Sequence, residues 1–475
     1  MSFSITGLAS GMDTAQMIEL MMKIERLPYE KLQTRRQELT QEQNVIRNIN
    51  TKLAALRDAA NDLLYNASFQ VKSARTSDAS VVSATAAEGA ANGSHQIQVV
   101  QLAQKHIVAS AEFAKGGPAS GLQDQQFKLF GKGDAQGKIF TLSGNTYEEM
   151  LVNLRDAINQ AGMGVRATLM ETKPGHVTLV LTSEHLGAEG QIRLEGVPDD
   201  SDLTVLKALG FVYEDENDEQ DKLNTKQEAQ NTVVFVNGIR VETEGNTLTN
   251  VLPGLTINLL KPGDATVTVE TDADAIADKI QKFVDAYNDV FTAIRAYTGK
   301  GAILQGDTTL NSLYSRLYSL LSDPVGGAGD FRFLFEIGLE IDRGVTSGGG
   351  MTGTISFDRN KFKEAFAANP EAVARLFTHD EPDSFSQDGV AVRFYNEILN
   401  WTRTGTGYLT SKIAGYDTTL KDITDQMERL DLRLQNRQKQ LEAQFAAMET
   451  ALAQLRSQQA WLAAQINILS MSLGS

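Results

Sequence analysis

The feature that most constrains the fold of this chain is a row of large apolar residues near its C-terminal end, spaced seven residues apart. The row comprises Leu420, Met427, Leu434, Leu441, Met448, Leu455, Leu462 and Leu469. Ile423 and Leu430 follow members of the row by three residues, whereas Ile466 follows one by four, so the apolar seam changes side around residues 437–441. Such spacing is typical of a long helix that packs against another helix, and it predicts that the last segment faces a different neighbour.

A second apolar seam with the same periodicity lies near the N-terminal end. Its members are Ile46, Ile49, Leu53, Leu56, Ala60 and Leu63, and Leu32 and Leu39 extend it toward the N-terminus. Two interpretations fit: each helix packs on its own domain, or the two ends of the chain pair with each other. Because few glycines or prolines interrupt either segment, we favour a coiled-coil stalk built from both ends.

An amphipathic helix is predicted just after the start of the chain, which reads ITGLASGMD from Ile5. Asp13 or Thr14 is suited to cap this helix, and Pro28 predicts a break or a fresh helix start. Its apolar residues share one face at helical spacing: Met17, Ile18, Met21, Met22 and Ile24. No lysine or arginine precedes the stretch and charged residues interrupt it, so it fits neither a cleavable signal peptide nor a membrane span. We expect a helix that needs a partner.

The composition of the chain argues against several classes of function. The net charge of −16 disfavours binding to nucleic acid, and the absence of cysteine excludes disulfides, thiolate catalysis and thiolate metal sites. The five histidines are scattered without the spacing of a metal motif, and no nucleophile elbow or phosphate loop occurs. We therefore expect no catalytic site, no cofactor, no metal and no insertion into a membrane.

Two short stretches imitate ligand-binding motifs without the context that those motifs require. Residues 348–353, GGGMTG, match GxGxxG but precede a strand instead of opening a helix, so we expect a flexible hairpin connection. Residues 214–221, EDENDEQD, lack the glycine of a calcium loop because Gln220 stands in its place. We expect this acidic stretch to be a solvated turn.

Between the helical ends the apolar period changes to two, which predicts strands. HQIQVVQL at residues 95–102 and VVFVNGIRV at residues 233–241 alternate in this way, and the pair Asn237-Gly238 predicts a tight hairpin. A long insertion over residues 112–231 adds a strand, a helix over residues 146–160 and two further strands. The middle of the chain is therefore predicted to hold two mainly β domains.

Helical periodicity returns from Ala273, and a short β element is predicted from FEIGLEID, residues 335–342, with TISFD, residues 354–358. Asp358 is suited to cap the helix that follows. The run Asn369-Pro370-Glu371 combines a capping residue, a proline for the first helical position and an acid for the first turn. Two short helices are therefore predicted over residues 359–377.

Several of these segments resemble one bacterial family, the flagellar filament capping proteins known as hook-associated protein 2. The similar segments are ITGLASGMD with ERLPYEKL near the N-terminus, GAILQGDTTLNSL (residues 301–313), residues 337–377, and QFAAMETALAQLRSQQAWL (residues 444–462). Residues 137–194 resemble a repeat motif of flagellins and hook-associated proteins. The resemblance spans nearly the whole chain, and its weakest part is the insertion at 112–231.

The resemblance implies a non-enzymatic, extracellular protein at the tip of the flagellum, exported without a cleaved signal peptide. It implies a ring of copies of the chain, a pentamer on the filament, that promotes insertion of flagellin and prevents its loss. Further implied partners are hook-filament junction proteins and an export chaperone that binds the C-terminal helix. Alternatives are a surface adhesin that uses the head, a filament or junction subunit without capping activity, and an enzyme built on the β domains.

Together these predictions give an α+β multidomain fold, in which long paired N- and C-terminal helices form a stalk that carries discontinuous, mainly β head domains. The expected domains are a leg region at 1–40 plus 440–475, unsettled in the isolated protein; a helical stalk domain with a small β element at 41–72 plus 272–439; a β head domain at 73–111 plus 232–271; and an inserted outer head domain at 112–231.

Two sets of residues are expected to carry the function. Packing of the stalk is assigned to Ile46, Ile49, Leu53, Leu56, Leu63, Leu420, Ile423, Met427, Leu430 and Leu434. Contact of the legs with the filament is assigned to Ile5, Leu8, Met17, Ile18, Met21, Leu455, Leu462, Ile466 and Leu469. Methionine-rich faces can re-pack on changing surfaces at little cost, which suits legs that bind successive sites.

Overall fold

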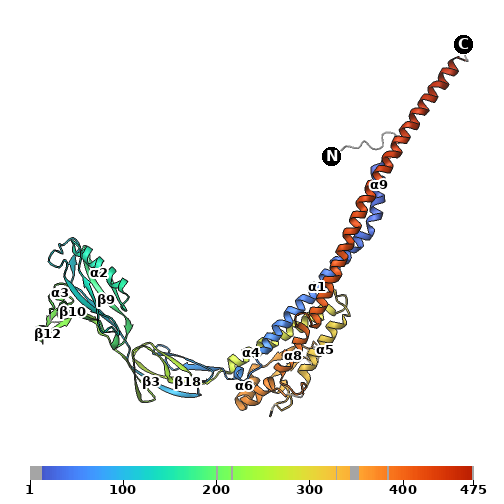
Figure 1. Ribbon diagram of the computed structural model, residues 1–475. Coiled ribbons are helices and arrows are strands. Elements are labelled where there is room, and N and C mark those ends of the chain that lie inside the picture. Colours follow the sequence, from blue (N-terminus) through green and yellow to red (C-terminus); the bar gives the residue numbers. More distant parts are fainter. Residues whose placement is uncertain are drawn as a thin grey trace. The chain divides into compact units, whose positions relative to one another are not determined.

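A computed structural model describes residues 13–198, 202–215, 218–327, 329–342, 352–381 and 384–472 (Figure 1). The chain forms two compact units. The helical unit combines Met1–Phe69 with Ala273–Ser475, and the head unit is the continuous segment Gln70–Asp272. The expected α+β fold, with terminal helices that flank β-rich domains, is confirmed.

The helical unit is built around two long helices from opposite ends of the chain. Its α-helices are α1 (Thr14–Asn61), α4 (Ala273–Thr298), α5 (Thr308–Ser322), α6 (Arg359–Ala368), α7 (Pro370–Thr378), α8 (Val390–Thr402) and α9 (Tyr408–Ser472). Single turns of 3-10 helix, η1 (Asn66–Phe69) and η3 (Leu334–Ile337), and one hairpin of β19 (Leu339–Ile341) with β20 (Ile355–Phe357) complete it. The predicted strand FEIGLEID is therefore shorter than expected, because its first residues form η3.

Side chains fix where these helices begin. The carboxylate of Asp13 accepts from Gln16 N at 2.9 Å, and that of Asp358 accepts from Lys361 N at 3.1 Å. The amide oxygen of Asn369 accepts from Ala372 N at 3.0 Å, with Pro370 in the first helical position. Each contact satisfies a backbone donor that the first turn of a helix leaves without a partner, so the predicted caps are confirmed.

The prediction of a break at Pro28 was wrong, since α1 is continuous from Thr14 to Asn61. Proline removes only one backbone hydrogen bond, and Pro28 lies on an exposed side of the helix where water can reach the carbonyl that is left free. Packing of α1 on both sides of this position outweighs that local loss.

The C-terminal half of α1 packs into a bundle with α4 and α8. Ile46, Ile49, Leu53, Leu56 and Leu63 are all fully buried. Aromatic pairs fill the bundle around them: Phe283 and Phe394 meet edge to face at 5.1 Å, and Phe291 stacks on Tyr314 at 4.1 Å between ring centroids. This part of the N-terminal seam therefore belongs to a domain core as well as to a helix pair.

The inner domain of the head unit is a sandwich of two antiparallel sheets. One has the order β1 (Lys72–Thr76), β18 (Gly263–Thr271), β3 (Gly93–Gln101), β14 (Thr232–Val236), β15 (Ile239–Thr243); the other has the order β16 (Thr247–Leu252), β17 (Leu255–Leu259), β2 (Val82–Ala86). Alternate residues of the strands, such as Ile97, Val234, Ile257 and Val267, form the core between the sheets. Asn237 and Gly238 have φ of 51° and 79°, as the tight hairpin turn requires, so that prediction is confirmed.

The outer domain surrounds a second core with two sheets and two helices. Its larger sheet contains β13 (Thr225–Gln227), β4 (Lys105–Ala109), β9 (His176–Leu186), β5 (Phe113–Ala114) and β8 (Val165–Lys173), and its smaller sheet β10 (Arg193–Gly196), β6 (Gln126–Phe130) and β7 (Lys138–Thr141). Helices α2 (Tyr147–Ala161) and α3 (Thr204–Ala208) pack against them, and η2 (Ala188–Gly190) is a single turn. Because β4 pairs with β9, the outer domain begins earlier along the chain than the expected residue 112.

The acidic stretch at 214–221 corrects another prediction. It lies largely in a two-stranded antiparallel hairpin of β11 (Val212–Asp215) and β12 (Asp218–Leu223), with Glu214 opposite Asp221. Val212 and Leu223, which face each other at the open end of the hairpin, pack on the outer core and anchor the pair of strands there. Local charge indicated a turn, but the flanking apolar residues determine a hairpin.

Candidate functional site

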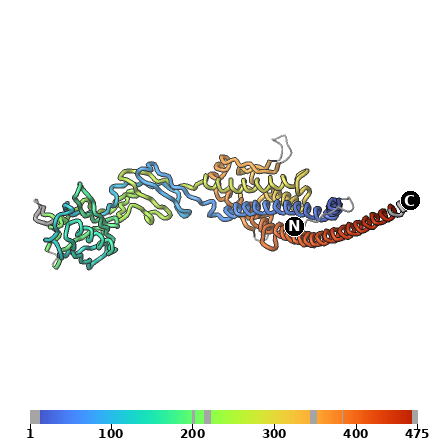
Figure 2. Tube along the Cα trace, turned by 90° about the horizontal axis from the view of Figure 1, so that it is seen from above, coloured from blue at the N-terminus to red at the C-terminus, as the bar shows by residue number. Residues whose placement is uncertain are grey.

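The candidate site is the antiparallel pair of helices α1 and α9, the first and last helices of the chain (Figures 1 and 2). Two apolar clusters hold the pair together. The outer cluster buries Met22, Leu434 and Leu441, with Ile18, Tyr29 and Phe445 packed on them. The inner cluster buries Leu39, Ile423 and Met427, with Tyr29, Leu32, Tyr416 and Leu420 packed on them. The expected pairing of the two chain ends is thus made by one continuous seam, which Tyr29 joins.

Polar contacts fix the register of the two helices at one end of the seam. The amide Nε2 of Gln43, itself buried, donates to Asp417 Oδ1 at 2.7 Å and to Ile413 O at 3.2 Å. Arg47 Nη2 approaches the same carboxylate oxygen at 3.1 Å. A buried amide that can be satisfied in only one alignment specifies register more strongly than leucines can.

A tyrosine and a distant ion pair extend this polar framework. The Tyr416 hydroxyl donates to Glu42 Oε2 at 3.0 Å, and burial together with the nearby Glu42 carboxylate raises the pKa of Tyr416 well above its usual range. Farther out, Arg437 Nε lies 3.2 Å from Glu25 Oε1. The tyrosine therefore stays a neutral donor to Glu42 at neutral pH.

The two helices overlap only in part. Gln43 lies beside Asp417, and both helices rise about 1.5 Å per residue, so Tyr408 at the start of α9 falls opposite about residue 50 of α1. Leu53, Leu56 and Leu63 lie past that point and are buried by the bundle, because α1 there contacts α4 and α8. Leu420, Ile423, Met427, Leu430 and Leu434 lie within the overlap, where Leu420 and Leu430 are half-buried and the other three are buried.

At the other end α9 continues past the described start of α1. There its large apolar side chains are exposed: Leu455 by 59%, Trp461 by 63%, Leu462 by 53% and Ile466 by 64%. The facing end of α1 adds Met17, Leu20, Met21 and Ile24, also exposed. So many neighbouring apolar side chains in contact with water mark a surface built for association.

The predicted leg residues are distributed as follows. Met17, Met21, Leu455, Leu462 and Ile466 are exposed, Ile18 is half-buried on the outer cluster, Ile5 and Leu8 lie outside the described residues, and of Leu469 only the backbone, within α9, is described. Met22 and Ile24, expected on one face, differ sharply: Met22 is buried in the seam, whereas Ile24 is 69% exposed. The partner helix therefore covers only part of the predicted apolar face, and the rest of that face is exposed.

Sequence reasoning missed Leu20, Leu27 and Trp461 as exposed members of the same surface. They were not among the residues assigned, which came from one apolar face of the N-terminal helix and from the spacing-seven row of the C-terminal helix with its flanking Ile466. A signal was present, since a helix that is apolar on most sides has to be covered by something other than one partner helix.

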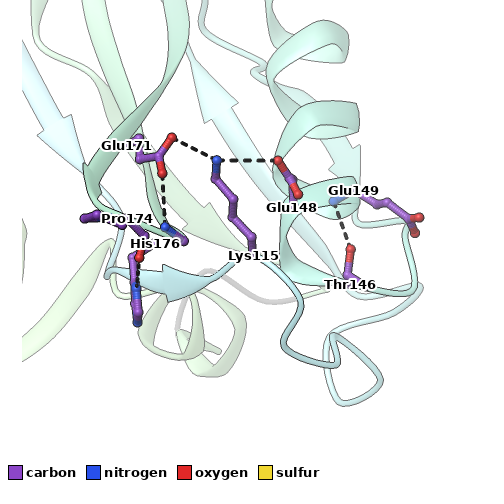
Figure 3. A network of polar contacts seen from close by, with 8 residues as sticks. Lys115, Thr146, Glu148, Glu149, Glu171, Pro174 and His176 are labelled. Carbon is purple, nitrogen blue, oxygen red and sulfur yellow. Dashed lines mark hydrogen bonds and ion pairs between the residues drawn. The ribbon is translucent and has the colours of Figure 1, made fainter.

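The head carries polar clusters, of which one on the outer domain is typical (Figure 3). Lys115 Nζ lies 2.9 Å from Glu171 Oε2 and 3.9 Å from Glu148 Oε1, and Glu171 Oε1 accepts from Gly175 N at 3.0 Å. The lysine joins the start of α2 to the turn between β8 and β9, and the pKa of Glu171 is lowered mainly by the hydrogen bond from Lys115. These contacts tie elements together and leave the lysine a paired cation, which does not suit it to act as a base or nucleophile.

Within the residues that the structure describes, no group of three or more histidine and acidic side chains is placed to hold a metal ion. Over the same residues, no helix is long and apolar enough to cross a bilayer. The exposed surface of the helix pair is therefore the feature of the described chain that most needs a functional explanation.

Comparisons with known proteins decide the family. A model of the N-terminal region of flagellar hook-associated protein 2 matches residues 10–106, and a model of its C-terminal region matches residues 229–457. The chain belongs to the flagellar hook-associated protein 2 family. The two matched regions include nearly all of α1 and most of α9, and they leave out most of the outer head domain.

Individual members of the hook-associated protein 2 family match over most of their length. The A-type protein of Pseudomonas aeruginosa is 26% identical over 96% of this chain and 95% of its own. The protein of Salmonella typhimurium is 26% identical over 67% of each chain. The crystal structure of the D1-D2-D3 domains of the flagellar cap protein FliD from Escherichia coli covers 78% of this chain and 99% of its own, with a TM-score of 0.58 and 23% identity, and thus shares its fold.

Proposed function

We propose that this chain forms the structural cap at the distal, extracellular end of the flagellar filament and contacts the filament through the exposed apolar surface of α1 and α9. Membership of the hook-associated protein 2 family supports the proposed location at the end of the filament. The FliD protein of matching fold is itself a flagellar cap protein. The single observation that supports the contact surface is the row of exposed Leu455, Leu462 and Ile466 on a helix that extends past its partner.

The cap promotes insertion of flagellin and prevents its loss, and it does so without an enzymatic step. An apolar helix face can bind any groove that is complementary to it. Each Å² of apolar surface buried in such contact contributes about 25 cal/mol to the binding free energy. Binding of this kind is strong only when many side chains engage together, so a leg can leave one site and occupy the next. The rigid pair of α1 and α9 behind it transmits that movement to the bundle.

Further partners follow from the same proposal. Copies of the chain associate in a ring, which is a pentamer on the filament. The first filament subunits contact this ring where it sits on the hook-filament junction proteins. Before assembly, an export chaperone covers the C-terminal part of α9, because its exposed leucines and Trp461 are prone to associate in water. Of the predicted legs at 1–40 and 440–475, the parts beyond the seam become fully ordered only on the filament, whereas Met22, Leu39 and Leu441 are already packed between α1 and α9.

A complementation experiment tests the contact surface. In a strain that lacks its own cap gene, Leu462→Asp is expected to leave short or absent filaments and to release flagellin monomer into the medium. Leu432→Asp is the matched control, because Leu432 is 62% exposed on the same helix but within the overlap with α1. Equal rescue by both variants would show that the projecting part of α9 does not bind the filament.

Export has to be measured in the same experiment. Leu462, unlike Leu432, also lies in the part of α9 that the export chaperone is proposed to cover, so the amount of each variant in the medium separates a defect in export from a defect in assembly. A Leu462→Asp protein that is exported normally yet fails to support filaments places the defect at assembly.

A further inference from the structure

The inner and outer domains of the head are joined by only two chain segments, around Gln104 and Gln230, which form a single antiparallel bridge. Gln104 N donates to Gln230 O at 3.0 Å, and Gln230 Nε2 donates to Leu102 O at 2.8 Å. A two-stranded ribbon of this kind is by itself easily twisted and bent. What fixes the orientation of the two domains must therefore lie beside the ribbon.

The inner end of this neck is held by Asn246. Its side-chain oxygen accepts from Ala103 N at 2.7 Å and its amide donates to Ala103 O at 3.1 Å, so one side chain binds both backbone groups of the same residue. Thr232 Oγ1 also accepts from Ala103 N, at 2.8 Å. The chain thus leaves the inner domain in a fixed direction.

Beside the neck, a loop of the outer domain packs closely on the inner domain. Ala188 N donates to Asn231 Oδ1 at 2.7 Å, and Gly187 N donates to Gln104 O at 3.2 Å. Gly187 has φ of 86°, and a Cβ placed on it would lie 2.8 Å from both Asn231 Oδ1 and the Cα of Glu244. Only glycine allows this approach, so the contact requires one relative placement of the two domains.

The side chain of Lys132 connects the inner and outer domains beside the neck. Lys132, in the loop after β6 of the outer domain, forms an ion pair with Glu244, which directly follows β15 in the inner domain, and a second with Glu189 of the outer domain at 3.2 Å. The lysine side chain is 28% exposed, so water screens the pairs only in part. Hydrogen bonds to the two carboxylates raise the pKa of Lys132, and the lysine lowers the pKa of Glu244, so both charges are present at neutral pH.

We propose that Lys132, Glu244 and Glu189 form an electrostatic latch that sets the stiffness of the neck, so that the two head domains move as one lever while the latch is closed and hinge at Gln104 and Gln230 when it opens. The latch is sensitive to salt, because screening lengths fall from about 10 Å at 0.1 M to about 3 Å at 1 M ionic strength. This inference concerns the head alone and does not depend on how the legs bind the filament.

The absence of cysteine makes a direct test possible, since two introduced cysteines are the sole sites for thiol-reactive spin labels. Gln160→Cys on α2 and Thr249→Cys on β16 place exposed labels on the outer and inner domains of the full-length chain. The distance distribution between the two labels, measured by pulsed dipolar spectroscopy, is expected to be narrow at low salt. Lys132→Met should broaden it, and 1 M sodium chloride should broaden it in the parent protein but not further in Lys132→Met.

Lys138→Met is the matched control, because it removes the same charge from the outer domain at an exposed position on β7. It should keep the narrow distribution, and an equally narrow distribution for Lys132→Met would overturn the latch. Far-UV circular dichroism verifies that each variant is folded. If Lys132→Met unfolds the head, Glu244→Gln is used instead, because it removes the inner-domain partner and leaves Lys132 paired with Glu189. A broader distance distribution in this variant supports the latch, and an unchanged width refutes it.

Discussion

The amide of Gln43 donates to the carboxylate of Asp417 at 2.7 Å, across 374 residues of sequence. The same amide donates to Ile413 O, one turn earlier on α9. Both acceptors are used only when the first and last helices are aligned in one register. This polar contact, between two apolar segments that could slide, determines which leucines meet and how far α9 projects past α1.

Gln43→Leu is expected to lower the free energy of unfolding of the helical unit by about 1 kcal/mol, the usual net value of a buried hydrogen bond, although leucine is the more apolar residue. Urea unfolding followed by tryptophan fluorescence measures this, because Trp401 and Trp461 both belong to the helical unit. Gln41→Leu is the control, since it makes the same chemical change at an exposed position two residues earlier on α1. If both variants unfold at the same urea concentration as the parent, the amide does not contribute to stability.

Leu53→Ala and Leu455→Ala make the same chemical change in opposite surroundings, because Leu53 is fully buried and Leu455 is 59% exposed. Leu53→Ala should cost about 2–5 kcal/mol through lost burial and an unfilled cavity. Leu455→Ala should change the free energy of unfolding by less than about 0.5 kcal/mol. The same fluorescence titration measures both, and a large loss for Leu455→Ala would mean that its side chain is packed in the free protein.

Leu53→Asp or Leu56→Asp tests the same buried seam by placing a charge in it. An unpaired carboxylate in this bundle should cost several kcal/mol, because burial of a charge without a partner is strongly unfavourable. The melting temperature, followed by far-UV circular dichroism, should fall sharply, whereas Thr51→Asp, an exposed position on the same helix, should melt like the parent. An unchanged melt for either leucine variant would contradict the burial of this seam.

His106 should make the head less stable in mild acid. Its Nδ1 accepts from Ile192 N at 2.8 Å, and burial lowers its pKa below the ordinary 6.5. A lowered pKa means that the unfolded chain binds the proton first, so this contribution is complete above pH 6.5 and is lost as the pH falls through that value toward the pKa in the folded protein. Histidine-selective NMR of the full-length chain should give a midpoint for His106 below 6.5.

His106→Asn supplies the comparison for that measurement. An asparagine oxygen can accept from Ile192 N without taking up a proton in this range. Amide hydrogen exchange of β10 and the segment before it should therefore increase between about pH 7 and about pH 5.5 in the parent, after correction for intrinsic rates, and remain nearly constant in the variant. A parallel increase in both would assign the acid sensitivity to another group.

Gly238→Ala should loosen the hairpin of β14 and β15. Gly238 has φ of 79°, a left-handed conformation that costs a residue with a Cβ about 1 kcal/mol. Hydrogen exchange of peptides from residues 232–243 should become faster. Gly245→Ala, where a Cβ meets open space, should leave exchange unchanged, and equal behaviour of the two variants would show that the turn is not constrained.

Much of this architecture could be predicted from local sequence because its signals are local. Asp13, Asp358 and Asn369 cap helices through contacts with residues two or three positions ahead, and Asn237-Gly238 forms its turn from its own φ preferences. Such features depend on a few neighbouring residues and little on the rest of the fold.

The errors arose where distant packing outweighs local preference. Pro28 indicated a break, but contacts of α1 on both sides keep the helix continuous. The acidic run at 214–221 indicated a turn, but Val212 and Leu223 pack on the outer core and impose a hairpin. The partners of Leu53 and Leu56 could not be read from periodicity, because a seam has the same spacing whether it faces α9 or the bundle.

The candidate site was predictable in its location but not in its extent. Periodicity pointed to Leu455 and Leu462, whereas Leu20 and Trp461 lie outside the repeating pattern and became evident only from their exposure. The latch in the neck had no local signal at all, since Lys132 and Glu244 lie 112 residues apart.

Because the helical unit is built from both ends of the chain, we expect it to finish folding after the head unit. Residues 70–272 form a contiguous unit with its own cores, so they can fold without waiting for the helices that follow them in the chain. The seam of α1 has to wait for α4, α8 and finally α9, which is the last segment to arrive. Until α9 is available, the apolar seam of α1 has no helix to pack against, so the stalk forms later than the head.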